Sequence, residues 1–441
     1  MKRRIENDLS EWKGSADRKP LIVFGARQVG KSYSLTEFGS RMYGNVAYFF
    51  FENNPKLQNL FSEGIDDIQT IIEKLSAYSG KTIMPSSTLI IFDEIQACNS
   101  ALSSLKRFYE DAPEYHIACA GSTLGLALKR DDYSFPVGKV DIMHMHPMNF
   151  EEFLTALGHD TLLKMIGDAF SSNKPLPDAL HSKALELYRR YLTVGGMPEA
   201  VRTYIERGDY VLVKAKQMSI LETYTTDMGK YSTPREANKT RAAYNSIPYQ
   251  LAKENRKFQY NLIKSGARAK EYESSLDWLK ITGVVLECRK TLGKAPLAFY
   301  VDPLSYKIYM SDVGLLTAKS DFIAMSVLTD TNLGGEAKGA LAENYVAQEI
   351  VAAGRNLYYW ESDGKAEVDF ILQGERGAIP VEVKAAENTR SRSLGVFKET
   401  YSPEYSVRIS SKNFGFENGI KSIPLYAVWC IRNLPAVQTQ T

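Results

Sequence analysis

The chain has 441 residues, and at roughly 150 residues per domain this length predicts about three domains. Hydrophobic residues make up 44% of the sequence and charged residues 24%, which are ordinary values for a globular protein. The 54 Lys and Arg residues nearly balance the 52 Asp and Glu residues and leave a net charge of +2. This balance excludes a uniformly basic chain, so binding of nucleic acid would require a local basic patch.

The four cysteines lie far apart and form no Cys-x-x-Cys pair: Cys98, Cys119, Cys288 and Cys430. This spacing argues against a disulfide framework and against a zinc ribbon, so we expect reduced cysteines in the core. The first residues, MKRRIENDL, lack the apolar run of a signal peptide, and no stretch approaches the ~18 apolar residues of a membrane span. The sequence therefore predicts a soluble, cytoplasmic protein without a membrane segment.

Residues 1–149 alternate between short apolar runs and amphipathic segments. The apolar runs predict strands at residues 21–24, 46–51, 89–92, 117–120 and 140–144. Helical periodicity between them predicts helices that include residues 31–38, 68–76 and 102–110. Strands that alternate with helices over this length predict an α/β fold, with a parallel sheet covered by helices on both faces.

After residue 149 the pattern changes. Residues 150–235 are almost wholly helical, and residues 236–303 combine helix-like segments with a predicted β-hairpin. Residues 304–441 mix helix with strand, and the expected elements are a helix at 341–353 and strands at 357–360, 367–371 and 379–384. We therefore predict four segments: an α/β domain, a helical domain, a small mixed module and a C-terminal α/β domain.

A glycine-rich loop joins the first predicted strand to the helix predicted at residues 31–38. Gly25-Ala-Arg-Gln-Val-Gly-Lys-Ser32 matches the phosphate-binding pattern G-x-x-x-x-G-K-[ST] in full. We therefore predict an ATP site formed by Gly25, Ala26, Arg27, Gln28, Val29, Gly30, Lys31 and Ser32. Backbone N–H groups would surround the phosphates, Lys31 would reach the β and γ phosphates, and Ser32 would ligate Mg²⁺. The structural alternative is a glycine turn followed by an exposed lysine.

Two adjacent carboxylates end a predicted buried strand, Thr88-Leu-Ile-Ile-Phe-Asp93-Glu94. Because ligands bind at the carboxyl ends of strands in α/β sheets, we predict that Asp93 binds Mg²⁺ and that Glu94 orients or deprotonates the attacking water. Ser122 or Thr123, after another predicted strand, would be a polar sensor of the γ phosphate. The alternatives are a solvated strand end for the two carboxylates and a plain polar turn for Ser122.

Residues 251–294 form a locally basic segment. They contain ten Lys or Arg residues against five acids, a net charge of +5. Two helices followed by a hairpin with strands at 283–290 and 297–301 resemble a winged helix, whose second helix, here Arg268 to Trp278, would enter the DNA major groove. DNA is therefore the candidate partner of this segment. The alternative is a structural or protein-contacting module that carries ordinary solvated lysines.

A second group of candidate catalytic residues lies in the C-terminal segment. Asp369, Glu382 and Lys384 alternate with apolar residues on predicted strands, and Glu343 lies upstream on a helix. This spacing fits the PD-(D/E)xK nuclease arrangement, in which Asp369 and Glu382 bind Mg²⁺ and Lys384 activates water or neutralises charge. A Glu-x-Lys pair on a strand is also common as a plain ion pair. An active nuclease and a nuclease-like fold used only for binding therefore both stay open.

Together these motifs resemble those of uncharacterised prokaryotic ATPases that join an AAA-type P-loop domain to a C-terminal domain of unknown function. Besides the loop, the resemblance rests on Phe92-Asp-Glu-Ile-Gln96, Phe135-Pro-Val-Gly-Lys139-Val, Pro147-Met-Asn-Phe-Glu-Glu-Phe-Leu154, Gly195-Gly-Met-Pro-Glu-Ala200, Glu367-Val-Asp-Phe and Pro380-Val-Glu-Val-Lys384. It implies a helical lid in which Gly196 and Pro198 line the base pocket, although a plain hinge explains that turn equally well. Many members carry Gly-Arg where this chain has Gly138-Lys139, which leaves any finger residue unassigned.

The patterns and the resemblance predict a Mg²⁺-dependent ATPase coupled to a DNA-associated C-terminal module with a candidate nuclease site. The alternative is a nucleotide-regulated switch or scaffold that binds a protein partner. ATP and Mg²⁺ are the expected cofactors. The sequence indicates no oligomeric state, so a homo-oligomer stays open.

Overall fold

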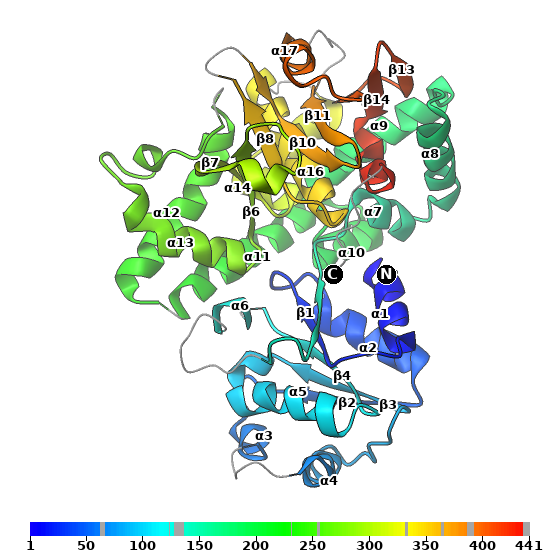
Figure 1. Cartoon of the computed structure of the whole chain (residues 1–441), viewed down its shortest axis with the longest axis vertical. Helices are drawn as coiled ribbons and strands as arrows, with labels where there is room; N and C mark the ends of the chain where they lie inside the picture. The colour runs from blue at the N-terminus through cyan, green and yellow to red at the C-terminus, as the bar shows by residue number, and fades with distance from the viewer. Residues whose placement is uncertain are drawn as a thin grey trace. The chain divides into compact units, whose positions relative to one another are not determined.

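The computed structural model describes residues 1–61, 67–122, 124–127, 136–230, 232–253, 256–330, 334–362, 366–385 and 392–434. The chain divides into two compact units (Figure 1). The first contains Met1–His146 and Ile281–Gly283, and the second contains the described residues of Pro147–Lys280 and Val284–Thr441.

The first unit is built around a parallel five-stranded sheet in the order β2–β3–β4–β1–β5. Its strands are β1 (Leu21–Phe24), β2 (Asn45–Phe50), β3 (Thr88–Asp93), β4 (His116–Ala120) and β5 (Asp141–His144). The helices are α1 (Ile5–Gly14), α2 (Lys31–Met42), α3 (Pro55–Asn59), α4 (Ile68–Ser79), the 3-10 helix η1 (Ile95–Ala97), α5 (Asn99–Asp111) and α6 (Leu124–Ala127). The predicted α/β class and the parallel sheet are confirmed.

Helices cover both faces of this sheet. Gly39 of α2 lies against Val46 of β2, since a Cβ added to Gly39 would be 2.7 Å from Cγ2 of Val46. Ala47, which follows Val46 in β2, packs instead in a core with residues of α4 and α5. Because successive strand residues point to opposite faces, α2 and the α4–α5 pair cover opposite sides, as Figure 1 shows. The carboxyl ends of the five strands therefore share one edge, where β1 meets α2.

The second unit begins with a helical region. Its helices up to residue 281 are α7 (Phe150–Ala156), α8 (Asp160–Ser172), α9 (Asp178–Val194), α10 (Pro198–Arg207), α11 (Tyr210–Lys230), α12 (Pro234–Leu251), η2 (Tyr260–Leu262) and α13 (Ala269–Ile281). Capping boxes start α7 and α12, because Asn149 and Thr233 each accept from a backbone N–H while Glu152 and Glu236 return the bond. These helices confirm the predicted helical stretch after residue 149.

Two sheets complete the second unit. One has the order β7–β6–β8–β9 and the other the order β10–β11–β12–β14–β13. The strands are β6 (Val285–Thr291), β7 (Val301–Met310), β8 (Tyr358–Glu361), β9 (Glu367–Val368), β10 (Phe370–Gly374), β11 (Gly377–Val383), β12 (Ser406–Ser410), β13 (Gly415–Glu417) and β14 (Ile420–Pro424). The helices between them are η3 (Leu297–Tyr300), α14 (Val313–Lys319), α15 (Ala324–Thr329), α16 (Gly335–Ala352), α17 (Arg392–Tyr401) and η4 (Leu425–Asn433).

Two predicted strands differ from the structure. Leu297–Tyr300, expected as part of a hairpin strand, is the 3-10 helix η3, and β7 begins only at Val301. Leu297 is nearly fully buried in a small core with Trp360 and Phe397, which favours a compact turn over an extended strand at this point. The predicted strand at 367–371 is divided at Asp369 into β9 and β10, which belong to different sheets.

The hairpin expected in a separate module shares its sheet with the C-terminal segment. β6 pairs with β7 on one side and with β8 on the other. The boundary expected between residues 303 and 304 falls inside β7. The β6–β7 hairpin is therefore part of the structure formed by residues 304–434.

Two further expectations concern the cysteines and membrane association. Cys98, Cys119, Cys288 and Cys430 are all free and buried, as expected for reduced core residues. None of the helices in the described part of the chain is both long and apolar enough to cross a membrane.

Candidate functional site

The glycine-rich loop connects β1 to α2 in a conformation that depends on its glycines. Gly25 and Gly30 have φ of 154° and 98°, and Gln28 also has a positive φ, of 66°. A Cβ on Gly25 would lie 2.1 Å from the carbonyl oxygen of Met145, so only glycine fits there. Ala26 and Val29 are buried, Arg27 is half-buried, and Gln28 is exposed.

Lys31 is the first residue of α2 and folds its side chain back over this loop. Its Nζ donates to the carbonyl oxygens of Gly25 at 2.8 Å and Ala26 at 2.9 Å. Burial lowers the pKa of Lys31 to about 8, while the charges of Glu94 and Asp93 oppose that change. The ammonium group of Lys31 thus lies within the loop and close to two carboxylates. Phosphate oxygens of a bound nucleotide would replace the loop carbonyls as its hydrogen-bond acceptors.

Ser32, Asp93 and Tyr48 converge on one point at the carboxyl edge of the sheet. The hydroxyl of Tyr48 donates to Oδ2 of Asp93 at 2.5 Å and also forms a hydrogen bond with Ser32. The other oxygen of Asp93 accepts the N–H of Glu94 at 3.0 Å. Mg²⁺ bound with a nucleotide prefers one or two protein oxygens beside the phosphates. The Ser32 hydroxyl and the Asp93 carboxylate, both bonded to the same phenol oxygen, fit that requirement.

Glu94 follows β3 in a left-handed conformation with φ of 50°. Its carboxylate accepts from Nε2 of Gln96, and the hydroxyl of Ser122 lies 3.4 Å from both carboxylate oxygens. A Cβ on Gly121 would lie 2.2 Å from Oε1 of Gln96, so this glycine leaves room for the glutamine. Ser122, expected as a γ-phosphate sensor, therefore lies beside Glu94. Thr123 lies outside the described residues.

Lys139, which ends the quoted Phe135-Pro-Val-Gly-Lys139 motif, has partners within the first unit. Its Nζ pairs with Glu110 of α5 at 2.9 Å and lies 5.1 Å from the ring centroid of Tyr109. Phe135 of the same motif lies outside the described residues. These contacts give Lys139 a local packing role and leave its relation to a nucleotide a prediction.

The Gly195-Gly-Met-Pro198 turn belongs to the second unit and is enclosed by backbone. The N–H of Gly196 donates to Oδ2 of Asp312 at 2.6 Å, and its carbonyl accepts from the N–H of Met148 at 2.7 Å. A Cβ on Gly196 would lie 1.9 Å from the Met148 carbonyl oxygen. Pro198 starts α10. These contacts explain both residues as parts of a tightly packed turn, and contact with a base stays a prediction.

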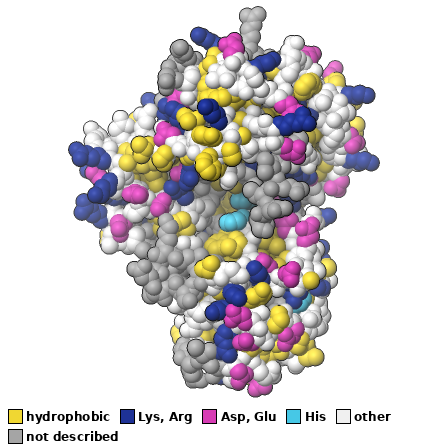
Figure 2. Space-filling model, viewed as in Figure 1, with side chains coloured by type: hydrophobic (Ala, Val, Ile, Leu, Met, Phe, Trp, Pro, Cys, Tyr) yellow, Lys and Arg dark blue, Asp and Glu magenta, His cyan; other side chains and the backbone are white. Residues whose placement is uncertain are grey.

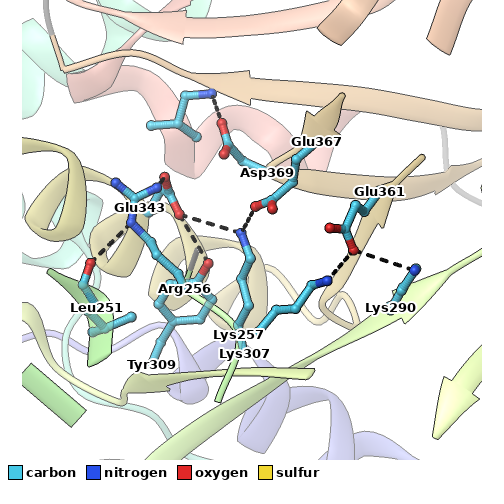
Figure 3. Close-up of polar contacts among 11 residues, drawn as sticks. Leu251, Arg256, Lys257, Lys290, Lys307, Tyr309, Glu343, Glu361, Glu367 and Asp369 are labelled. Carbon is cyan, nitrogen blue, oxygen red and sulfur yellow. Dashed lines mark hydrogen bonds and ion pairs between the residues drawn. The ribbon is translucent and has the colours of Figure 1, made fainter. Parts of the chain in front are cut away.

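Figure 3 shows a network of acids and cations that includes Glu343, with Asp369 beside it. Glu343 of α16 pairs with Arg256, accepts from the hydroxyl of Tyr309 at 3.2 Å and lies 4.0 Å from Nζ of Lys307. Lys307, which is fully buried, also pairs with Glu367. These contacts join Glu343 to the strands β7 and β9.

The three residues predicted from the strand pattern lie at the edge of the same network. Oδ2 of Asp369 accepts the N–H of Val383 at 2.7 Å, and Oε1 of Glu382 pairs with Nζ of Lys384 at 2.7 Å. Burial raises the pKa of Asp369 well above its ordinary value, and the charges of Glu343 and Glu382 raise it further. Asp369, Glu382 and Lys384 are thus brought together as the sequence predicts.

A divalent ion does not fit this cluster as it is folded. Within the described ranges, no group of three His, Cys, Asp or Glu side chains is arranged to hold a metal ion. One observation points the other way, because Oε2 of Glu382 is buried without a hydrogen-bond partner among the described residues. Both oxygens of Glu343, however, already face protein donors. The cluster as folded therefore offers a metal ion no free set of ligands among the described residues.

The basic segment 251–294 is partly neutralised by acids outside it. Among the described residues, five of its ten cations form ion pairs: Arg256, Lys257, Lys280, Arg289 and Lys290. Three of these, Arg256, Lys257 and Lys290, pair with Glu343 or Glu361 outside the segment. Lys264, Arg268 and Lys270, at and before the start of α13, are exposed. On the face drawn in Figure 2, basic and acidic side chains are interspersed. A DNA-binding surface in this segment would thus be smaller than the net charge suggests.

Sequence reasoning missed several residues that shape these sites. Tyr48 gave only one signal, its place on an alternating strand next to the strand that ends in Asp93. Gln96 belongs to the quoted Phe92-Asp-Glu-Ile-Gln96 motif but had no assigned role. Arg3 gave no signal, yet its buried guanidinium donates to the carbonyl oxygens of Val29 and His146, both at 2.7 Å, and braces the loop. Arg256 contributes to the basic count of residues 251–294, although it is paired with Glu343.

Comparisons with solved structures give distant likenesses. The Walker-type ATPase PABY2304 of Pyrococcus abyssi is 17% identical over 72% of this chain and 95% of its own length, with a TM-score of 0.42. The ORC2 protein of Aeropyrum pernix is 12% identical over 76% of this chain and 90% of its own, with a TM-score of 0.35. RuvB of Thermotoga maritima is 14% identical over 64% of this chain and 87% of its own length, with a TM-score of 0.29. These TM-scores are too low to establish a shared arrangement.

Family models divide the chain into three matched regions. Residues 185–326 match a domain of unknown function (DUF8612), and residues 338–428 match another (DUF4143), so neither match assigns an activity to the second unit. No curated protein matches the chain. Residues 17–154 match the AAA domain, and this range contains the parallel sheet, the Gly25–Ser32 loop and the Asp93–Glu94 strand end. Residues 17–154 therefore form an AAA-type P-loop domain.

Proposed function

We propose that the first unit binds ATP with Mg²⁺ and hydrolyses it. The observation that carries this proposal is the convergence of Lys31, Ser32, Asp93 and Glu94 at the carboxyl edge of a parallel sheet, with Lys31 buried and its pKa lowered by that burial. Phosphate oxygens would offer Lys31 a stronger partner than the loop carbonyls, because the ion pair is charge-assisted. The loop and the strand end thus suit a nucleoside triphosphate.

Each side chain has a distinct task in this proposal. The bound ATP·Mg²⁺ supplies the electrophilic γ-phosphoryl group. Lys31 and the loop N–H groups hold the phosphates, and Ser32 and Asp93 hold the metal ion. Glu94 accepts a proton from water, and Gln96 and Ser122 keep its carboxylate in one orientation. A base held in this way needs little reorganisation when the water attacks.

Two variants separate binding from hydrolysis. Lys31→Ala should remove most of the affinity for ATP, because the buried ammonium group is lost. Glu94→Gln should bind ATP about as well as the parent and lose most of its turnover, since a general base contributes roughly 10² to 10⁴ in rate. Nucleotide titration and phosphate release measure the two effects. Turnover in Glu94→Gln equal to that of the parent would remove Glu94 from the mechanism.

For the second unit we propose association with DNA, coupled to the ATPase. The supporting residues are Lys264, Arg268 and Lys270, which are exposed. Cations of this kind bind phosphates without reading sequence. Incubation of the purified protein with plasmid and oligonucleotide DNA, with and without ATP and Mg²⁺ or Mn²⁺, tests binding and cleavage together.

The second candidate function is a nucleotide-regulated switch or scaffold that binds a partner and cuts nothing. The contacts of the Glu343 network favour it over a nuclease, because Arg256, Lys307 and Lys384 neutralise the acids that would bind metal. Cleavage that requires a divalent ion and is abolished by Asp369→Ala would overturn this candidate. An intact plasmid in every condition, together with ATP turnover, would support it.

A further inference from the structure

We infer that Arg256 and Lys307 are built-in counter-ions that take the place of a divalent cation in the carboxylate cluster of the second unit. This inference deepens the scaffold candidate above and rests on it. The carboxylate cluster is defined here as Glu343, Glu367, Asp369 and Glu382. In the folded chain most of its charge is offset by cations of the protein itself, and it is closed to metal.

Arg256 reaches the cluster because Gly339 leaves room for its side chain. Its guanidinium crosses α16 at Gly339, where an added Cβ would lie 2.7 Å from Nη2. Nε donates to the carbonyl oxygen of Leu251 at 3.1 Å, and Nη1 pairs with Oε1 of Glu343. The Arg256 side chain therefore caps the C-terminal end of α12 and neutralises Glu343 of α16 (Figure 3). A glycine at 339 and a carbonyl at the end of α12 fix the guanidinium in one position.

Lys307 occupies the interior of the cluster. Its side chain is fully buried on β7, and Nζ pairs with Glu367 and lies 4.0 Å from Oε2 of Glu343. Burial alone would lower the pKa of Lys307, but the charges of Glu343 and Glu367 raise it above its ordinary value. The ammonium group is thus held charged between two carboxylates that lie on different elements, as a divalent ion would be.

The cations of the chain offset most of the charge of the cluster. Three cations, Arg256, Lys307 and Lys384, face the four acids of the cluster, so at most one negative charge is left without a partner cation. Desolvating a divalent ion is costly, and a cluster with so little excess negative charge offers too little in return. Removing one cation would increase that excess.

The test measures binding of Mn²⁺ alone to the nucleotide-free full chain, by electron paramagnetic resonance. The parent should show no Mn²⁺ site that depends on Asp369. Arg256→Gln should gain one Mn²⁺ site that depends on Asp369, because Glu343 is left as an uncompensated buried charge. The double variant Arg256→Gln with Asp369→Asn should lose that site.

Two control variants distinguish this effect from a general loss of positive charge. Lys257→Gln removes a cation one residue away that pairs with Glu361, outside the cluster, and should gain no Mn²⁺ site. Arg256→Lys keeps the charge and should stay closed to Mn²⁺. Because Arg256→Gln is expected to destabilise the fold, thermal unfolding with and without Mn²⁺ provides a second readout. The midpoint of Arg256→Gln should rise with Mn²⁺ and that of Lys257→Gln should not.

Either of two results would overturn the inference. One is an Asp369-dependent Mn²⁺ site in the parent, which would mean that the internal cations do not exclude metal. The other is a folded Arg256→Gln chain that neither binds Mn²⁺ nor is stabilised by it. No nucleotide takes part in the measurement, so failure of ATP hydrolysis in the first unit would be seen separately, in the assays of Lys31→Ala and Glu94→Gln.

Discussion

The hydroxyl of Tyr48 donates a hydrogen bond of 2.5 Å to Oδ2 of Asp93. The same hydroxyl is bonded to Ser32, so the two proposed Mg²⁺ ligands share one protein partner. A metal ion that binds both Ser32 and Asp93 must therefore displace this hydroxyl or draw it into a new position. Tyr48 comes from β2, whose own residues carry no recognised nucleotide motif.

Removing the Tyr48 hydroxyl should make the metal site easier to fill. We expect Tyr48→Phe to lower the Mg²⁺ concentration for half-maximal nucleotide binding by about tenfold, since a hydrogen bond to a charged group contributes roughly 1.5 kcal/mol. Binding of a fluorescent ADP analogue at a series of Mg²⁺ concentrations measures this. Affinity in the presence of a chelator should stay unchanged.

Tyr33→Phe is the matched control, because Tyr33 lies on α2 next to Ser32 with its ring exposed to solvent. It should leave the Mg²⁺ midpoint where it is. If Tyr48→Phe weakens binding equally with and without Mg²⁺, the tyrosine contacts the nucleotide or supports the fold, and the displacement argument is wrong.

Gln96 should act on turnover and not on affinity. Its Nε2 donates to Glu94, so Gln96→Ala frees the carboxylate to rotate. We expect kcat to fall about tenfold, a part of the roughly 10² to 10⁴ that a general base supplies, with KM within about twofold of the parent. Gln69→Ala, which changes an exposed glutamine bonded only locally to Glu73, should have no effect. A KM change as large as the kcat change would argue against a positioning role.

DNA binding by the second unit should depend on salt and on three cations. Replacing Lys264, Arg268 and Lys270 with Gln should weaken binding and reduce the slope of log affinity against log salt concentration by roughly 2 to 3. Fluorescence anisotropy with a labelled duplex at several salt concentrations measures the slope. The control replaces three other exposed cations of the same unit, Lys164, Lys174 and Arg207, with Gln. Equal losses in the two triple variants would show that the effect is only one of net charge.

Glu349 should make the stability of the protein depend on pH. Its Oε1 accepts the N–H of Phe150 at 2.8 Å, and burial, assisted by Glu151 and Glu152, raises its pKa to about 8. An unfolded glutamate has a pKa of about 4.3, so between these values the folded chain binds the extra proton. The free energy of unfolding should therefore decrease as pH rises from about 4.3 to about 8, by at most ~1.4 kcal/mol per pH unit.

Glu349→Gln tests this dependence because the amide keeps the acceptor for Phe150 and cannot ionise. Urea unfolding of the parent and the variant at pH 5, 6, 7 and 8 gives the comparison. We expect the difference in unfolding free energy to shift in favour of the variant as the pH rises. Parallel pH profiles in the two proteins would show that Glu349 does not titrate in this range.

The enclosed turn at Gly196 should not tolerate a side chain. Gly196→Ala would place Cβ 1.9 Å from the carbonyl oxygen of Met148, and we expect a loss of about 3 kcal/mol in unfolding free energy. Gly167→Ala on α8 is the control, because nothing lies within 4 Å of its added Cβ, and helix propensity predicts a gain of roughly 0.5 to 1 kcal/mol. A folded Gly196→Ala protein of parental stability would mean that this turn is looser than its contacts indicate.

In the first unit, the features that could be predicted from the sequence are those formed by residues close together in the chain. The loop Gly25–Ser32 and the strand that ends in Asp93 each carry a local pattern, and strand alternation with helices is sufficient to place both at one edge of a sheet. Tyr48 and Arg3 could not be found in this way. Their contacts cross 45 residues from Tyr48 to Asp93 and 26 from Arg3 to Val29, and neither pair has a characteristic spacing.

In the second unit the local patterns misled where long-range contacts decide the structure. The basic count of residues 251–294 treats each cation as solvated, whereas Arg256 pairs with Glu343, 87 residues later. The pattern Asp369, Glu382 and Lys384 correctly brings these residues together, but it says nothing of the buried Lys307 on β7. Leu297 could not be recognised as part of a turn, because the core that buries it includes Trp360 and Phe397.

The shared sheet β7–β6–β8–β9 limits how this chain can be divided or exchanged with others. A fragment ending at residue 303 would keep β6 but lose β8 and most of β7, leaving backbone N–H and C=O groups exposed along both edges of β6. Unpaired edges of this kind readily join strands of other molecules. Residues 236–303 therefore cannot be moved into another protein as a unit that folds by itself. Recombination between related genes would preserve this fold only where the exchanged segment contains the β6–β7 hairpin together with residues 358–361.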